Sequence, residues 1–155
     1  MNTPQTPPPT FTEMRLPDSL KQLIGSAYDR TRYFSVAYVG LDGRPELSFR
    51  GSVQVYSDNQ LAVWARNPEG GLQKAMNANP NMVLLYGDFT PGSYAVITFR
   101  GRGHIDTSEA ARRQVYESAA KGEQDRDKER KGDALIIDLD SVDGFFSGGV
   151  LKMKR

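Results

Sequence analysis

The stretch RGSVQVYSDNQLAVWARNPEGGLQKAMNANPNMVLLY, residues 50–86, decides the fold, because the segments on either side of it make sense as support for what it builds. It predicts a strand, a short turn, a second strand, a glycine-containing loop, a short helix and a third strand. Two strand ends and a helix start would then meet near Arg50, Arg66, Gly70, Gly71 and Lys74. Cations beside the free N–H groups of a helix N-terminus favour a phosphate or a carboxylate.

A plainer interpretation of the same residues stays open. Gly70 and Gly71 form a flexible turn in that case, and Arg50, Arg66 and Lys74 are solvated, as most surface cations are. The loop matches neither a P-loop nor a Rossmann fingerprint. Spacing alone therefore does not choose between an anion site and an ordinary surface.

The order of the segments is more specific. It consists of Arg50 opening a strand, the strand end Trp64-Ala65-Arg66, a Gly-Gly loop, a helix, and Asn79-Pro80 before the strand of residues 82–86. This order resembles the pyridoxamine 5'-phosphate oxidase-like, FMN-binding split-barrel family. The resemblance extends from about residue 20 to residue 150, including Gly101-Arg102-Gly103 and Val142-Asp143-Gly144-Phe145.

The resemblance implies a cofactor site. In it, Arg50 contacts the flavin phosphate, the strand after Arg50 lies along the flavin, and the end of the next strand reaches the ring or the ribityl chain. The family usually has Ser or Arg followed by Lys in the phosphate loop, where this chain has Gly71 and Leu72. Lys74 replaces the missing charge only if the first helical turn rotates it inward. Trp64 either edges the flavin ring or packs in the core. The candidate cofactor residues are Arg50, Gly51, Ser52, Val53, Gln54, Trp64, Ala65, Arg66, Gly71, Leu72 and Lys74.

The predicted fold is mainly β (α+β), an antiparallel split β-barrel with two to three helices, which is also the fold that the resemblance implies. Residues 1–15 are predicted to be a disordered Pro-rich tail, and residues 16–155 a single FMN-binding domain. Helices are expected from near residue 18 and over residues 109–120, and residues 121–131 as a solvated helix extension or a mobile loop.

The predicted strand of residues 94–105 has two faces. Arg100, Arg102 and His104 share one face, which either covers solvent or lines a cleft at a subunit interface. Gly101 and Gly103 leave room for another backbone or for a flat ring to come close.

Composition excludes several classes of protein. The chain has 155 residues, which suit one domain, and a formal net charge of +1, which gives no field for nucleic acid. With no cysteine and one histidine it is expected to have no disulfide and no metal site. No apolar run approaches the ~18 residues that a membrane span needs, and no signal peptide is recognised, so a cytoplasmic protein is expected.

The functional hypothesis is an FMN-dependent oxidoreductase that acts on an unknown small-molecule redox substrate, with NAD(P)H as a candidate electron donor. The resemblance also implies a homodimer with flavin sites at the subunit interface. No catalytic residue is assigned. True pyridoxamine phosphate oxidase activity is not expected, because the segment Gly148 to Arg155 lacks the residues that grip the substrate phosphate in those enzymes. The alternatives are a non-catalytic flavin-binding, storage or regulatory module, and a split-barrel reductase that binds a deazaflavin or a tetrapyrrole.

Overall fold

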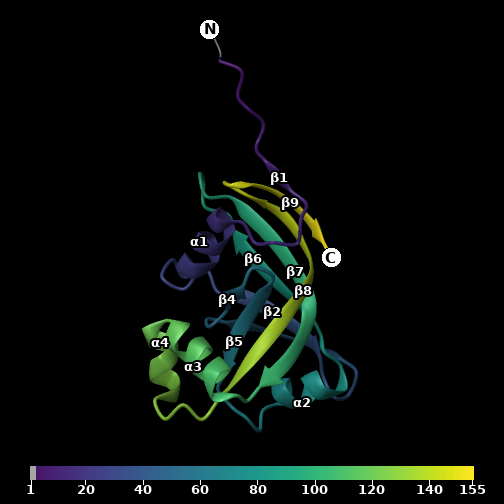
Figure 1. The fold of residues 1–155 in the computed structure, drawn as a ribbon, viewed down its shortest axis with the longest axis vertical. Helices are drawn as coiled ribbons and strands as arrows, with labels where there is room; N and C mark the ends of the chain where they lie inside the picture. The colour runs from purple at the N-terminus through teal and green to yellow at the C-terminus, as the bar shows by residue number, and fades with distance from the viewer. Residues whose placement is uncertain (1–2) are drawn as a thin grey trace.

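The computed structural model describes residues 3–155 and confirms a mainly β, split-barrel α+β fold (Figure 1). The strands are β1 (Thr10–Phe11), β2 (Phe34–Val39), β3 (Pro45–Arg50), β4 (Gln54–Ser57), β5 (Gln60–Ala65), β6 (Asn81–Asp88), β7 (Ala95–Asp106), β8 (Asp133–Phe146) and β9 (Gly149–Lys154). The helices are α1 (Asp18–Ser26), α2 (Gly71–Ala78), α3 (Glu109–Ser118) and α4 (Lys121–Gln124), followed by the 3₁₀ turn η1 (Asp125–Asp127).

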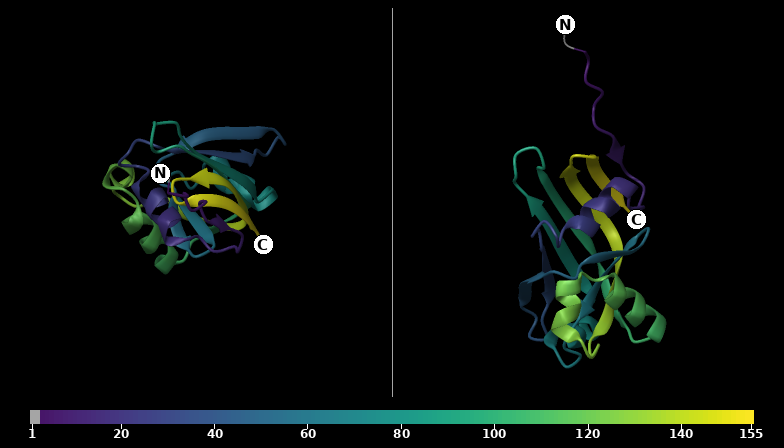
Figure 2. Two further views of the ribbon diagram at one scale, coloured as in Figure 1. Left: turned by 90° about the horizontal axis from the view of Figure 1, so that it is seen from above. Right: turned by 90° about the vertical axis from the view of Figure 1, so that its left-hand side faces the viewer.

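The strands form one sheet that curls around its own interior (Figure 2). Its main order is β1-β9-β8-β7-β6-β2-β3, and β8 carries the curl because its first half pairs with β5 and its second half with β9. The register between β7 and β8 shifts between Arg100 and Gly101, where Asp140 is an extra residue in β8, and this bulge lies where β8 passes from one partner to the other. A side chain at Gly101 would collide with the backbone of Asp138, so the close approach foreseen at this glycine is made by β8 itself.

The barrel interior is filled by alternate residues of the strands and closed by helices at its ends. Phe34, Tyr86 and Phe99 form an aromatic group with ring centroids 5.4 and 5.9 Å apart. At one end Leu20 and Ile24 of α1 enter the core, and at the other Leu72, Ala75 and Met76 of α2 do so. A side chain at Gly103 would lie 2.6 Å from the sulfur atoms of Met76 and Met82, so the chain's own methionines occupy the space beside this glycine.

A second, smaller core lies outside the barrel, under α3. Trp64 packs edge-on against Tyr116 with ring centroids 5.2 Å apart, and Val115 and Ile136 are buried with them. Helix α3 begins where the sequence predicts it, because Ser108 caps it by accepting a hydrogen bond from the N–H of Ala111 at 3.2 Å.

The charged segment of residues 121–131 is held against the barrel. The Asp127 carboxylate accepts hydrogen bonds from the Trp64 indole N–H at 2.9 Å and from the N–H groups of Lys131 and Gly132 at 3.0 and 2.9 Å. Burial raises the pKa of Asp127, but these three donors and the charge of Lys131 together outweigh it, so the pKa is lowered. The prediction of a helix extension or a mobile loop is therefore wrong in part: the segment is two short helical turns pinned to β5.

The N-terminal segment that lies outside the fold is also shorter than the predicted tail of residues 1–15. Thr10–Phe11 form a parallel bridge with β9, the N–H of Val150 donates to the carbonyl of Pro9 at 2.8 Å, and Phe11 packs against the core. Residues 3–8 extend away from the body as exposed chain without regular structure (Figures 1 and 2), and residues 1–2 of the predicted tail lie outside the described part. No helix within residues 3–155 is long and apolar enough to cross a bilayer.

Candidate functional site

The candidate site begins at Arg50. The prediction that Arg50 opens a strand is wrong, because it is the last residue of β3 and the next strand, β4, begins only at Gln54. Arg50 is partly buried and lies opposite Phe34 of β2, at the edge of the sheet. Its Nε atom is buried and has no hydrogen-bond partner. Within residues 3–155, Arg50 takes part in no ion pair. A buried donor of a charged group is rarely left unsatisfied, so this guanidinium is suited to an acceptor from outside the chain.

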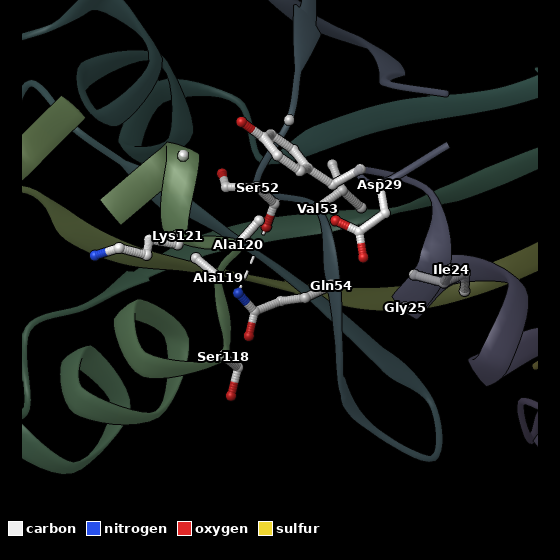
Figure 3. A pocket seen from close by; sticks show the side chains of 13 residues that line it. Ile24, Gly25, Asp29, Ser52, Val53, Gln54, Ser118, Ala119, Ala120 and Lys121 are labelled. Atoms are coloured by element: carbon white, nitrogen blue, oxygen red, sulfur yellow. Dashed lines mark hydrogen bonds between the residues drawn. The ribbon is translucent and has the colours of Figure 1, made fainter. Parts of the chain in front are cut away.

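Directly after Arg50, the connection from β3 to β4 forms one wall of a pocket of about 400 Å³. Four of the predicted cofactor residues line it, namely Gly51, Ser52, Val53 and Gln54. The end of α1 and the link between α3 and α4 form the other walls, with Ile24, Tyr28, Asp29, Ala119, Ala120 and Lys121 among the lining residues (Figure 3). This volume lies within the range of small-molecule and cofactor sites.

Ser52 fixes the pocket wall to β5. Its Oγ accepts a hydrogen bond from the Trp64 N–H at 3.1 Å and lies 3.4 Å from the Trp64 carbonyl, to which it donates. The side chain is buried and its bonding capacity is used inside the chain. Ser52 is therefore a positioning residue, and only its backbone is free to face a ligand.

Tyr28 closes the pocket between two glycines. A side chain at Gly122 would collide with the Tyr28 hydroxyl, and one at Gly51 would collide with the Glu123 carboxylate and lie 3.2 Å from the Tyr28 ring. Burial raises the pKa of the Tyr28 phenol, and the nearby Tyr33 and Glu123 raise it further. The phenol is consequently neutral at pH 7 and retains its proton as a hydrogen-bond donor.

The predicted residues on β5 do not line this pocket. Trp64 and Ala65 are both buried, and Trp64 faces α3, where its indole N–H is bonded to Asp127 and the Arg112 guanidinium lies 5.7 Å from the ring centroid. Of the two roles considered for Trp64, the structure favours packing. Ala65 contributes its carbonyl oxygen, which accepts a hydrogen bond from Gln73 of α2 at 3.3 Å.

The start of α2 is separate from Arg50. Leu72 is buried in the core, whereas Arg66, Gly71 and Lys74 are exposed. Gly71 borders a hollow of about 270 Å³ with Tyr38, Asp42 and Glu46. Glu46 lies four residues before Arg50 on β3, which is about 13 Å in an extended strand.

Of the two strand ends and the helix start that were predicted to meet, only β5 and α2 are in contact, through Gln73 and Ala65. The carboxylates of Asp42 and Glu46 beside the helix start disfavour a phosphate there. The pocket at residues 51–54 is the stronger candidate site.

Sequence reasoning missed the two outer walls of that pocket. Tyr28 follows α1, and the segment of residues 118–122 follows α3, so both are distant in sequence from residues 51–54. Neither segment carries a local motif that marks it as part of a site. Only the packing of α1 and α4 against the turn after β3 brings them together.

Comparison with solved structures identifies the fold. HupZ from Group A Streptococcus is 22% identical, with a TM-score of 0.62 over 86% of this chain and 97% of that one. General Stress Protein 26 from Bacillus anthracis str. Sterne is 18% identical, with a TM-score of 0.61 over 81% and 93% of the two chains. A protein related to general stress protein 26, of the pyridoxinephosphate oxidase family, from Clostridium acetobutylicum has 10% identity and a TM-score of 0.59 over 84% and 95%.

No family model and no curated protein sequence matches this chain. At these identities the structural similarities establish the fold alone. That fold is the pyridoxamine 5'-phosphate oxidase-like split barrel, as the order of the segments predicts.

Proposed function

We propose that this chain, which has the pyridoxamine 5'-phosphate oxidase-like fold, binds FMN and works as a flavin-dependent oxidoreductase on a small-molecule substrate. The observation that carries the proposal is the buried, unpartnered Nε of Arg50 next to the pocket lined by residues 51–54. A cation without an internal partner and a pocket of cofactor size stand side by side at the position where the resemblance places the flavin.

The residues present fit the two ends of FMN. Arg50 offers a planar set of N–H donors that matches a phosphate with parallel, charge-assisted hydrogen bonds. Ile24, Val53, Ala119 and Ala120 give the pocket apolar surface for a ring system. The flavin, when bound, supplies the electron-transfer chemistry, and the chain supplies binding, orientation and exclusion of water.

The proposal relies on Arg50 and residues 51–54, and not on the start of α2. Leu72 lies in the core and Gly71 lies beside two carboxylates, so neither is assigned to the phosphate. Arg66 and Lys74 are exposed and serve as reference positions for the experiment below.

The proposal includes a homodimer. The outer face of the barrel carries exposed apolar side chains on three strands of the sheet: Leu47 and Phe49 on β3, Val83 and Leu85 on β6, and Phe145 on β8. Leu47 and Phe49 are 73% and 74% exposed, which is unusual for large apolar side chains on a sheet. A second copy of the chain is the partner proposed for this face, beside the Arg50 end of β3.

The outer face is less cationic than its sequence suggests. Arg100 pairs with Asp143 at 3.4 Å, Arg102 with Asp140 at 3.1 Å, and His104 lies 3.6 Å from Asp138. Each basic group on β7 thus has a carboxylate on β8, and the face presents paired charges beside apolar rows. A surface of this kind suits a subunit interface better than a polyanion.

The test is the affinity for FMN and for riboflavin, measured by fluorescence quenching or calorimetry in the parent, R50A and R66A. Replacing Arg50 is expected to raise the Kd for FMN about tenfold to a hundredfold, because hydrogen bonds to a charged group are lost. Riboflavin has no phosphate, so its Kd should change little. R66A removes an exposed cation that directly follows β5 and should change neither value.

Two results would overturn the assignment: a parent protein that binds no flavin, or an R50A variant that loses FMN and riboflavin equally. Bleaching of bound flavin by NAD(P)H without oxygen would support a reductase, whereas bound flavin that no donor reduces would favour a storage or regulatory module.

A further inference from the structure

Gln54 lies in the wall of the pocket. It is a buried polar side chain whose hydrogen-bonding groups are not all used. It is 8% exposed, and its Nε2 donates to the carbonyl of Val115 at 2.9 Å and lies 3.5 Å from the carbonyl of Ser52. Its Oε1 is buried and has no hydrogen-bond partner. The amide nitrogen is thus hydrogen-bonded within the chain, and the amide oxygen is not.

The orientation of this amide is fixed by its neighbours. Exchanging the oxygen and nitrogen would place Oε1 against the Val115 and Ser52 carbonyls, where two acceptors would face each other. Figure 3 shows the amide nitrogen turned toward Ser52 and the oxygen turned away from it, on the side of Ser118. The group that remains free is therefore a hydrogen-bond acceptor.

A buried acceptor without a partner is costly, since its desolvation is not compensated. Gln54 lines the pocket, so a ligand with a donor is the natural partner for this oxygen. The ring of an oxidised flavin carries one N–H group, N3–H, which lies between two carbonyls. A pocket wall with an acceptor whose orientation is fixed suits such a ring edge.

We propose that Gln54 is a specificity residue whose Oε1 accepts the N3–H of the flavin ring, an inference that rests on the proposed flavin binding. In this arrangement Val115 and Ser52 hold the amide, Arg50 holds the phosphate, and Gln54 sets which edge of the ring enters the pocket. A ring without a donor at that position leaves Oε1 unsatisfied and binds less tightly.

The experiment compares FMN with FMN methylated at N3, in the parent and in Q54M. The parent is expected to bind the methylated form about tenfold or more weakly, because a buried acceptor loses its donor. Q54M has a side chain of similar size without a carbonyl, so it should bind the two forms within about twofold of each other. Circular dichroism and urea unfolding establish that each variant is folded.

Gln73 supplies a matched control. It is also more than nine-tenths buried and donates through Nε2 to a backbone carbonyl, that of Ala65, but it does not line the pocket. Q73M should therefore retain the preference for unmethylated FMN, whatever it does to stability.

The outcomes separate the inference from the proposed function. If the parent binds both forms equally, or if Q54M keeps the full preference, Gln54 is not the N3 acceptor although the protein still binds flavin. If the parent binds neither form, flavin binding itself is wrong, and the role of Gln54 falls with it.

Discussion

At the scale of single residues, Asp88 at the end of β6 helps to hold the segment after α1 against the sheet. Its side chain is 4% exposed and pairs with Arg30 and with Arg32 at 3.2 Å each. Arg30 also donates to the Tyr86 hydroxyl at 2.7 Å and reaches back to the carbonyl of Leu23 in α1 at 3.2 Å. This network positions the segment after α1, which includes Tyr28 in the pocket wall.

The ionisation of Asp88 makes the free energy of unfolding depend on pH. Hydrogen bonds from the Thr90 N–H and hydroxyl, with help from Arg32, lower the pKa of Asp88 to about 2 from 3.8, although burial opposes them. A carboxyl whose pKa is lower in the folded state stabilises the fold above the unfolded pKa, and this contribution is lost as the pH falls from about 4 to 2.

We expect D88N to lower the free energy of unfolding by about 2 kcal/mol at pH 7, the equivalent of the pKa shift. Urea unfolding at pH 7, 4 and 3 should show the parent and the variant converging as the pH falls. E129Q removes a carboxylate from an exposed pair with Lys131 and should change stability by less than about 1 kcal/mol. A difference between parent and D88N that stays constant down to pH 3 would contradict this account.

At the scale of elements, the N-terminal segment divides between Pro8 and Pro9. From Pro9 onward it is part of the fold: Gly149 has φ +149°, and a side chain there would lie 2.5 Å from the Pro9 carbonyl and 2.9 Å from the Phe11 ring. The N–H of Leu16 then donates to the carbonyl of Asp58 at 2.7 Å. β1 thereby covers part of the edge of β9, which a sheet would otherwise expose.

Two deletions test this division. Removal of residues 1–8 should leave the melting temperature within about 1 °C, because residues 3–8 are exposed. Removal of residues 1–12 should lower it by a few degrees, since it also takes away the Phe11 packing and the bridge to β9. Equal melting temperatures for the two proteins would show that β1 contributes nothing to stability.

At the scale of the whole molecule, one outer face of the barrel exposes apolar side chains beside an unpaired strand edge. β3 is an edge strand, and its outward residues continue the apolar rows of β2 and β6: Ala37 lies between Leu47 and Val83, and Ser35 between Phe49 and Leu85. A second subunit would cover both the rows and the open edge. The flavin site proposed at Arg50 lies at the end of this same strand.

We therefore expect the parent to be a dimer in light scattering at micromolar concentration and neutral pH. F49E places a charge on the apolar face of the proposed interface and should give a monomer that retains its far-UV circular dichroism. L41E is the control, because Leu41 is 65% exposed in the turn between β2 and β3, and a charge there should leave the dimer intact. A monomeric parent would rule out the interface.

Local pattern was enough to predict most of the elements, although not β1 or the turns α4 and η1. The alternation of residues 95–105 predicts the buried Ala95, Ile97 and Phe99 and the outward Arg100, Arg102 and His104, and helical spacing predicts Leu20 and Ile24 as core. Burial on one face of a strand or helix imposes a period on the sequence, so it can be read without the fold. Arg50 and residues 51–54 were expected at one site because of the family resemblance and not because of a period, and residues 51–54 do line one pocket.

The tertiary structure alone decided which of these segments meet. Because β8 bends from β5 to β9, Trp64 faces α3 instead of the pocket of residues 51–54, and the start of α2 lies beside Asp42 and Glu46 instead of Arg50. The pocket is completed by Tyr28 and by residues 118–122, which no periodicity connects to residues 51–54. Contacts between distant segments depend on how the whole sheet curls. A hydrophobic pattern that repeats about every two residues in a strand, or about every four in a helix, does not determine that curl.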